Sequence, residues 1–359
     1  MWACITPISE GRGQKDACRT AVDPSNRTPF GRRRQRKLFC FALPVNAPPL
    51  FVSFSSVDAL IEALPADTRE AYEAEIRSLA ARGLPPAVSM RTLGAIFGVS
   101  TEFIGALSRA PHRYYRTFRI KKGRKIREIQ APRVALKVIQ RWIGFYIARS
   151  AVLSPCVFGF IPGKGVIDAA KLHCQAEWVY SLDLRDFFPN ITATQVRDSL
   201  LTLGYAERAA ILITNLCTLG GQLPQGSPAS PVLSNLVFMM TDTALEAVAE
   251  SEGVRFSRYA DDLVFSGKGV PPENLANRVR KVLVNNGWQI ANEKEHLARL
   301  PARLKVHGLL VHGARPRLTK GYRNKIRAFR HLLAADKITL KDISKVKGHL
   351  AYADFVKKA

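Results

Sequence analysis

The spacing of apolar residues predicts helices towards both ends of the chain. Helical signals begin at Ser56, a residue type suited to cap the apolar run that follows. A second helix is expected from about Thr68 to Ala81, with Asp67 as its cap and Gly83 past its end. Near the C-terminus, apolar residues recur on one face of another predicted helix: Ile326, Phe329, Leu332 and Leu333. No internal repeat at a fixed period is present.

The middle of the chain changes to strand and turn patterns. Residues 118–129 alternate apolar and basic residues about a Lys-Gly turn, as a half-buried hairpin does. An amphipathic helix is expected after Pro132, and its apolar face consists of Leu136, Ile139, Ile143 and Ile147.

Residues 92–107 carry a competing signal. Two short apolar segments around a glycine-containing turn have the spacing of a helix-turn-helix, which reads duplex DNA. The same spacing describes any packed helical hairpin. Both interpretations stay open from the sequence.

The charge balance indicates what kind of partner the protein binds. The 359 residues, 47% of them hydrophobic, are enough for one large domain or for two or three joined subdomains. Lys and Arg number 54 against 29 Asp and Glu, a formal net charge of +25. Such an excess repels itself in the compact state and indicates an anionic partner, foremost nucleic acid. A merely high-pI protein without such a partner is the alternative.

The N-terminal region and the cysteines suggest an intracellular setting. Residues 1–50 lack a hydrophobic period and include the basic run 32–37, so we expect a flexible basic arm or a start codon chosen too far upstream. The six cysteines form no C-x-x-C pair and fit reduced thiols. No run of about 18 apolar residues and no secretory pattern is visible, so we expect a cytoplasmic protein without a membrane span.

Three aspartates carry the candidate chemistry. An apolar strand ends at Asp183, and Asp261 and Asp262 lie at a tight turn between two β-favouring segments. Adjacent carboxylates in an apolar hairpin are costly unless a cation neutralises them. Two Mg²⁺ ions would do so and would also align a 3′-hydroxyl with the leaving pyrophosphate. An ordinary acidic turn is the alternative.

These residues belong to a set of motifs that resembles the bacterial reverse transcriptases, most closely the retron class, over about residues 90–330. The Tyr-x-Asp-Asp box is matched by residues 259–262, the preceding aspartate box by 183–188 and the Gln-Gly box by 223–235. A fingers box is recognisable around Lys121, Arg127 and Pro132. The order of the boxes is specific, although any one alone is not.

The resemblance implies an α+β right-hand polymerase fold, with fingers, a palm of antiparallel sheet plus helices, and a small helical thumb. It divides the chain into the flexible basic arm 1–50, an N-terminal helical region 51–112, the fingers and palm 113–305, and a primer grip with a basic, RNA-binding helical thumb 306–359.

The same resemblance implies the catalytic set Asp183, Asp261 and Asp262, with the backbone carbonyl of Leu184 as a further metal ligand. Residues expected to meet the incoming dNTP are Arg127 with Lys121 or Lys122, Phe188, Gln225, Gly226 and Lys294. An aromatic ring at Phe188 would exclude a 2′-hydroxyl and so favour dNTPs. Each of these residues also has a structural alternative. The alternatives are an exposed basic hairpin for Lys121 and Arg127, a core side chain for Phe188, a Pro-flanked loop that caps a helix for Gln225 and Gly226, and a solvated surface residue for Lys294.

The assignment to the retron class depends on weaker motif matches. Retron enzymes carry an Asn-Ala-x-x-His segment, of which Ala170 and His173 are present, and a Val-Thr-Gly segment, which reads Val306-His307-Gly308 here. The residues expected to bind RNA are His173, His307, Gly308, Arg317, Arg323 and Lys325. Core histidines and a solvated helix face are the alternatives. About thirty residues follow the thumb-like segment, too few for a maturase or endonuclease domain, which favours a retron enzyme over a group II intron enzyme.

By this resemblance, the protein is expected to be an RNA-directed DNA polymerase that binds its own structured non-coding RNA and uses dNTPs. It would prime from a guanosine 2′-hydroxyl and make branched RNA–DNA (msDNA), in anti-phage defence with a separate effector protein. The alternatives are another bacterial reverse transcriptase, of group II intron or abortive-infection type, and a helix-turn-helix regulator.

Overall fold

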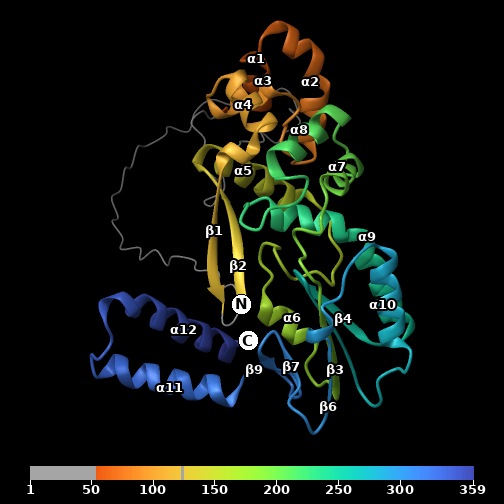
Figure 1. Ribbon diagram of the computed structural model, residues 1–359, viewed down its shortest axis with the longest axis vertical. Helices are drawn as coiled ribbons and strands as arrows, with labels where there is room; N and C mark the ends of the chain where they lie inside the picture. Colours follow the sequence, from red (N-terminus) through yellow and green to blue (C-terminus); the bar gives the residue numbers. More distant parts are fainter. Residues whose placement is uncertain (1–53, 123–124) are drawn as a thin grey trace, which may run out of the picture.

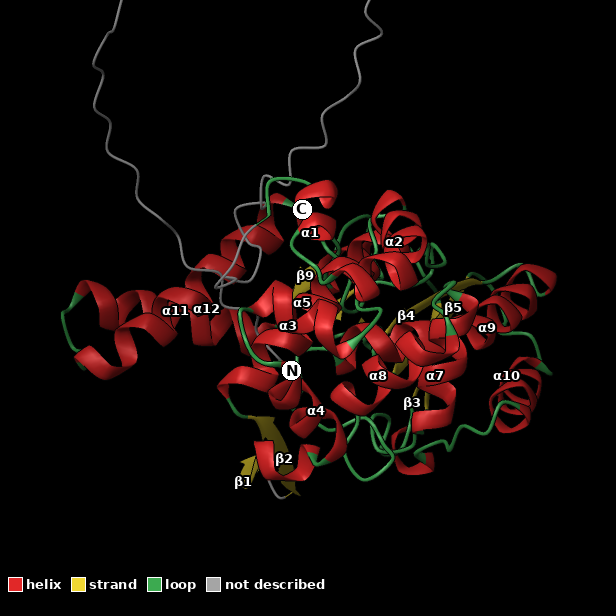
Figure 2. Cartoon of the chain, turned by 90° about the horizontal axis from the view of Figure 1, so that it is seen from above, coloured by secondary structure: helices red, strands yellow, loops and turns green. Residues whose placement is uncertain are grey.

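The computed structural model describes residues 54–122 and 125–359. Figure 1 shows an elongated molecule with a group of helices at one end and a β-sheet towards the other. A helical pair projects sideways from the sheet end, as the view from above in Figure 2 also shows. The predicted basic arm, residues 1–50, lies outside the described residues.

The N-terminal helical region consists of α1 (Val57–Glu62), α2 (Ala66–Ala81), α3 (Met90–Phe97) and α4 (Thr101–Arg109). Ser56 caps α1 as predicted, because its Oγ accepts a hydrogen bond from the Ala59 amide at 3.0 Å. The predicted cap of α2 is wrong: the helix begins at Ala66, directly after Pro65, so Asp67 lies in its first turn. A carboxylate in the first turn is still favourable next to the positive end of the helix dipole.

The packing of α3 and α4 favours the plain helical hairpin over a DNA-reading motif. The two helices pack against each other, and α4 also packs against α8 (Glu207–Cys217). Leu93, Ile104 and Leu107 are each 0% exposed. The apolar residues that produced the helix-turn-helix pattern therefore build the protein core.

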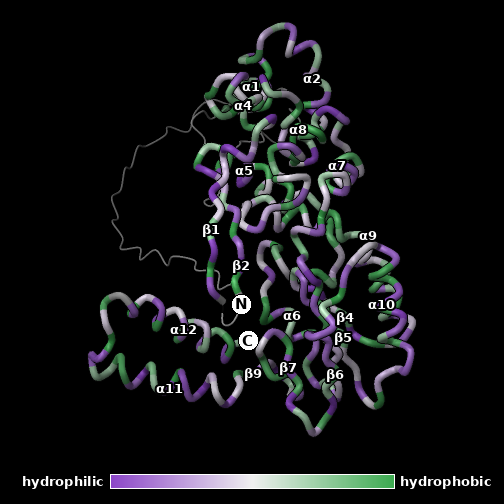
Figure 3. Tube along the Cα trace, viewed as in Figure 1, coloured by the Kyte–Doolittle hydropathy of each residue, from purple (hydrophilic) through white to green (hydrophobic). Residues whose placement is uncertain are grey.

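The predicted basic hairpin and the helix after it are both present. A short turn, η1 (Pro111–Tyr114), leads into the antiparallel strands β1 (Tyr115–Lys122) and β2 (Lys125–Pro132). Figure 3 shows hydrophilic stretches along both strands. The helix α5 (Val134–Ser150) follows, with a buried apolar face that includes Leu136, Ile143 and Ile147.

The sheet that organises the rest of the chain has four antiparallel strands in the order β4-β5-β3-β6. They are β3 (Trp178–Asp183), β4 (Arg255–Tyr259), β5 (Asp262–Gly267) and β6 (His296–Arg299). The helical elements of this part are α6 (Val166–Leu172), α7 (Ala193–Thr202), α9 (Ser230–Ser251), α10 (Leu275–Asn285) and η2 (Asn292–Lys294). Antiparallel strands combined with separate helices give the expected α+β class.

The C-terminal part begins with a small three-stranded sheet and ends in two helices. The strands are β7 (Lys305–Val306), β8 (Leu309–Leu310) and β9 (Arg317–Leu318). The helices are α11 (Lys320–Ala334) and α12 (Leu340–Lys358), which pack against each other. The predicted basic helix is therefore present, although Ile326 is the one buried residue of its apolar face within the described part of the chain.

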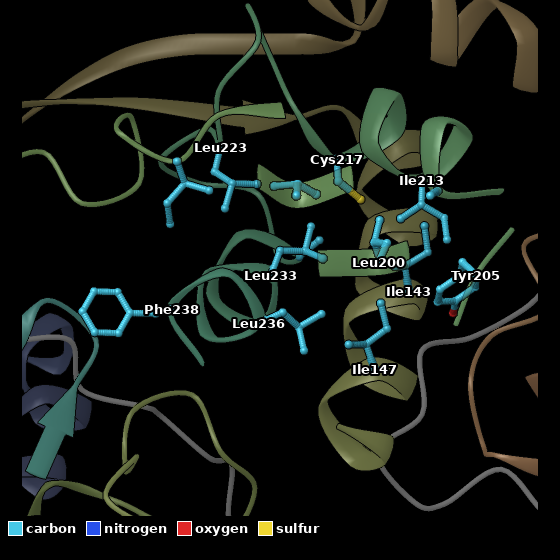
Figure 4. Packing of buried hydrophobic residues seen from close by; sticks show 14 of the residues in the cluster. Ile143, Ile147, Leu200, Tyr205, Ile213, Cys217, Leu223, Leu233, Leu236 and Phe238 are labelled. Carbon is cyan, nitrogen blue, oxygen red and sulfur yellow. The ribbon is translucent and has the colours of Figure 1, made fainter. Parts of the chain in front are cut away.

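Two apolar clusters hold these parts together. The larger runs from α1–α4 through α5, α8 and α9 to the sheet, so the N-terminal helices share a core with the rest. Figure 4 shows part of it, where Ile143 and Ile147 of α5 lie near Leu233 and Leu236 of α9. The smaller cluster joins α6 and the sheet to β7–β9, α11 and α12. The C-terminal helices therefore depend on a separate and smaller core.

The helix α9 is central to the larger cluster. Among the residues that the structure describes, it is the one helix long and apolar enough by composition to cross a membrane. Of its most apolar window, 56% is buried inside the protein. It packs against α5, α7, α10 and β4, as a core helix does.

Candidate active site

The three aspartates meet at one end of the four-stranded sheet. Asp183 is the last residue of β3, and the strand register pairs it with Asp262, the first residue of β5. Asp261 lies in the turn between β4 and β5. Opposite residues in an antiparallel pair have Cβ atoms about 5 Å apart. The predicted strand end and hairpin tip therefore come together from segments almost 80 residues apart in sequence.

The charges of the three carboxylates oppose one another. Burial raises the pKa of Asp183 to about 6, against the effect of the neighbouring Lys294 and with that of Asp261. Burial and the charge of Asp262 also raise the pKa of Asp261. Burial acts the same way on Asp262, but His307, Asp183 and Lys294 together lower the pKa of Asp262. The ionised cluster is thus electrostatically unfavourable without added positive charge.

Two basic side chains contact this cluster. Lys294 in η2 donates from Nζ to Asp183 Oδ1, and His307 Nδ1 lies 3.6 Å from Asp262 Oδ2. Within residues 54–122 and 125–359, no group of three or more His, Cys, Asp or Glu side chains is placed so as to hold a metal ion by itself. Asp183 and Asp261, whose pKa values are raised, nevertheless offer the carboxylate oxygens that a hard divalent cation prefers. The residues at this sheet end therefore fit a divalent metal ion.

The turn that carries Asp261 is tightly enclosed. Ala260 has a φ of 58°, in the left-handed region that non-glycine residues rarely adopt. A Cβ atom on Gly159 would lie 2.4 Å from the Ala260 nitrogen, so only glycine fits there. The Leu184 amide donates to the Asp261 carbonyl at 3.0 Å, which ties β3 to the turn. Our sequence interpretation missed Gly159, because a single glycine carries no such signal.

The two adjacent phenylalanines have different surroundings. Phe187 is 5% exposed and packs against Phe238 and Trp288. Phe188 is half-buried, and its ring centroid lies 6.2 Å from that of Phe160, which in turn lies 6.5 Å from Tyr259. Phe187 is therefore the core residue of the pair, and Phe188 is the one on the side of Phe160 and Tyr259. Phe160 was missed from the sequence.

The β1–β2 hairpin separates two residues that were expected to act together. The register pairs Arg127 with Ile120, and Lys121 with Ile126. Opposite residues share a face and neighbours alternate, so Lys121 and Arg127 lie on opposite faces of the hairpin. Joint contact of Lys121 and Arg127 with one triphosphate would require the Lys121 side chain to reach round the hairpin, and it stays a prediction. Arg127 is the residue whose charge reaches the site, where it acts to lower the pKa of Asp261.

The Gln-Gly segment forms a loop held between β2, α5 and the start of α9. The Gln130 amide donates to the Gln225 carbonyl at 2.9 Å. A Cβ atom on Gly226 would lie 2.7 Å from the Gln130 carbonyl oxygen, so the close approach requires glycine. Ser227 Oγ donates to the buried Gln140 Oε1 at 2.8 Å. This loop therefore joins the basic hairpin to α9.

The two histidines expected to bind RNA lie inside the protein. His173 is 0% exposed, and its ring nitrogens lie 2.7 Å from Ser257 Oγ and from Ser266 Oγ. Burial lowers its pKa to about 3, so the ring is neutral. This favours the core-histidine alternative for His173. The His307 side chain is 6% exposed and lies beside Asp262 and Tyr259, which places it at the aspartate cluster.

The remaining RNA-binding candidates are on the surface. Gly308, Arg317, Arg323 and Lys325 are all exposed. A shallow groove near the start of α11 is lined by Arg303, His312, Lys320 and Arg323, among others. The structure thus separates a carboxylate centre on the sheet from a basic surface on the C-terminal part.

Comparisons with known proteins identify the family. The family model described as reverse transcriptase (RNA-dependent DNA polymerase) matches residues 120–309. The retron Mx65 reverse transcriptase of Myxococcus xanthus is 30% identical over 298 residues, which cover 76% of this chain and 70% of that protein. The retron Ec86 reverse transcriptase of Escherichia coli is 28% identical over 274 residues, 75% of this chain and 85% of that protein. The chain belongs to the reverse transcriptase family and is a retron-type RNA-directed DNA polymerase.

Proposed function

We propose that Asp183, Asp261 and Asp262 are the catalytic carboxylates with which this enzyme adds deoxynucleotides to a primer on an RNA template. The observation that carries the proposal is the pairing of Asp183 with Asp262 across β3 and β5, with Asp261 in the adjoining turn. Mutual repulsion and burial disfavour the ionised cluster until cations bind.

The cations that we propose are two Mg²⁺ ions. Reverse transcriptases in general use divalent metal ions. Asp183 and Asp261 would hold them, with Asp262 nearby and the Leu184 carbonyl as a further ligand. When bound, the ions supply positive charge that activates the 3′-hydroxyl and neutralises the leaving pyrophosphate.

We propose that the dNTP binds between the aspartates and the fingers hairpin. Arg127 would meet the triphosphate, since a guanidinium offsets charge on phosphoryl oxygens. The Gln225-Gly226 loop would contact the base and template side, and Phe188 would lie beneath the sugar and exclude a 2′-hydroxyl. Lys294, which contacts Asp183, would assist the leaving group.

The RNA would bind along the C-terminal part. We propose the division into N-terminal helices 51–112, fingers and palm 113–305, and thumb 306–359. Gly308, Arg317, Arg323 and Lys325 are exposed and three of them are cationic, which suits the backbone of an A-form duplex. We expect His307 to act at the aspartate end of this path, beside Asp262, and His173 to support it from the core.

By its family, the enzyme would act in the cytoplasm on its own structured non-coding RNA. It would prime from a guanosine 2′-hydroxyl and produce branched msDNA, in anti-phage defence with a separate effector protein. An untemplated, abortive-infection type of synthesis is the second candidate, because the same carboxylates would serve it.

Sequencing of bound nucleic acid tests this proposal. The protein is purified from cells that carry its neighbouring locus, and the nucleic acid that co-purifies is sequenced, with Asp183→Asn as the matched control. We expect DNA joined to one defined RNA with wild type, and that RNA alone with the variant. DNA without a complementary RNA would support untemplated synthesis, and DNA of equal amount with the variant would contradict the proposed carboxylate role.

A further inference from the structure

Arg258, the residue before Tyr259, is 0% exposed although its side chain is charged. It lies on β4, whose alternate residue Phe256 is also in the core. An isolated buried charge is strongly unfavourable, so it persists only when it is paired and hydrogen-bonded. The structure therefore has to satisfy a guanidinium directly beneath the turn that carries Asp261.

The partners of Arg258 come from α9. Its Nε and Nη2 donate to the two carboxylate oxygens of Asp242, both at 2.6 Å, in a bidentate pair. Its Nη1 donates to Asn235 Oδ1 at 3.0 Å. Asp242 is 0% exposed and Asn235 1% exposed. The guanidinium carbon lies 4.6 Å from the ring centroid of Phe238, which closes the site on that side.

The same Nη1 also donates to the Ala260 carbonyl at 3.2 Å. This bond reaches the strained residue of the turn, which has a φ of 58°. A strained backbone persists where its surroundings over-determine it. Here Arg258 holds the turn from one side and Gly159 encloses it from another.

Asn235 connects Arg258 and Gly159, which hold the turn from two sides. Its Oδ1 accepts from Arg258, and its Nδ2 donates to the Gly159 carbonyl at 2.9 Å. Backbone bonds complete the assembly, since the Arg258 amide donates to Cys156 and the Phe158 amide donates to the Arg258 carbonyl. The turn before Asp261 is thus fixed to the core helix α9 rather than only to its own hairpin.

We propose that Arg258, held by Asp242 and Asn235, is a positioning residue that fixes the Ala260 backbone and thereby places the Asp261 carboxylate. This inference rests on the proposed catalytic role of Asp261. It assigns the buried pair a role in turnover beyond its contribution to stability.

The double variant Arg258→Met/Asp242→Leu separates these two contributions. Replacing a buried ion pair by apolar residues of similar size is often neutral or stabilising, so we expect a Tm close to that of wild type. The bond to the Ala260 carbonyl is lost, however. Because small displacements of reacting groups cost roughly 10- to 100-fold in rate, we expect kcat for dTTP addition on poly(rA)/oligo(dT) to fall by that factor.

Four further readouts distinguish positioning from general damage. We expect the KM for dTTP and the affinity for the template–primer to stay within about threefold of wild type, since neither contacts Arg258. The Mg²⁺ concentration for half-maximal activity should rise several-fold. The increase in Tm that Mg²⁺ gives the full-length protein should shrink relative to wild type, because a displaced Asp261 binds the ion less well.

The control Leu283→Ala removes a fully buried side chain from α10 and lowers stability without touching the turn. If the double variant does not fold, Arg258→Lys is compared with Leu283→Ala at equal distance below each Tm. A kcat within threefold of wild type in the folded double variant, or of Leu283→Ala in the lysine variant, would overturn the inference. Activity in Asp261→Asn would instead overturn the proposed function on which it rests.

Discussion

The aspartate end of the sheet and the C-terminal helical pair hold their charged residues in opposite surroundings. The first gathers like charges and holds them with buried residues, among them Arg258 and Asp242, which are both 0% exposed. The second displays its cationic residues to solvent, and α11 has Ile326 as its single buried residue among those described. Rigid placement serves a reaction, in which small displacements are costly. Exposed charge serves binding of a polyanion, in which many contacts add up.

The comparison also concerns stability. The sheet end shares the large core with the N-terminal helices, α5, α8 and α9. The helical pair depends on the smaller cluster under the sheet. Regions with few buried apolar contacts open locally at lower free energy than the global core. We therefore expect α11 and α12 to exchange amide hydrogens faster than β3 and β5.

The sharpest test of the comparison separates turnover from binding at Asp183. We expect Asp183→Asn to lower kcat by at least about 10³-fold, because it removes a carboxylate from the proposed metal site. RNA affinity, measured by filter binding, should stay within about threefold. The exposed Asp198→Asn on α7 removes the same charge elsewhere and should leave both quantities unchanged. Equal losses of kcat in Asp183→Asn and Asp198→Asn would contradict the separation of turnover from RNA binding.

The opposite dissociation is expected for the helical pair. Arg323→Gln/Lys325→Gln removes two exposed cations of α11. RNA affinity should fall about tenfold, and the slope of log K against log salt should decrease by about 1.5, since each lost phosphate contact removes roughly 0.7 to 0.9. The kcat at saturating RNA should not change. Arg278→Gln/Lys281→Gln, on the exposed face of α10, is the control and should keep wild-type affinity and slope.

A third change tests selectivity within the carboxylate region. Phe188→Ala removes the ring next to Phe160, and we expect the preference for dTTP over UTP to fall by roughly 10-fold or more, since a steric barrier to the 2′-hydroxyl is removed. The ratio of kcat/KM values for the two nucleotides measures this. Phe187→Leu is the matched control: it should lower Tm through lost core packing and leave the ratio intact. An unchanged ratio in Phe188→Ala would contradict the proposed role of Phe188 in excluding a 2′-hydroxyl.

The smallest effect is a pH dependence of stability in chelator. The pKa of Asp183 in the folded protein is raised to about 6, above its ordinary value near 4, so ionisation destabilises the fold as pH rises from about 4 to 6. Asp183→Asn lacks this titration. The Tm of the variant should match that of wild type near pH 4 and exceed it by a few degrees above pH 6. A constant gap, or a wild type that becomes more stable than the variant, would contradict the electrostatic picture.

The sequence predicted the aspartates better than the residues that hold them in place. Alternation and turn chemistry around Asp261 and Asp262 were enough to predict the hairpin, because both are local properties. The partners of Arg258 lie on α9, more than ten residues away, and no local pattern reports them. The strand register that separates Lys121 from Arg127 is likewise a pairing property that the motif does not encode.

The histidines show the same limit. His173 and His307 were assigned to RNA from their positions in motifs, whereas their surroundings depend on which elements pack around them. His173 lies between two serines from β4 and β5, and His307 lies next to Asp262. Burial of a polar residue is decided by tertiary packing, which periodicity predicts only for the apolar face of an element.

Single-turnover primer extension tests the central claim most directly. Wild type and Asp261→Asn/Asp262→Asn are each loaded with a DNA primer annealed to an RNA template, and the reaction starts with dNTPs and Mg²⁺. We predict that wild type extends the primer in the order given by the RNA, and that the double variant binds the same hybrid with equal affinity but extends it at least about 10³-fold more slowly. Equal extension by the two proteins, or wild-type extension that ignores the RNA sequence, would contradict the account.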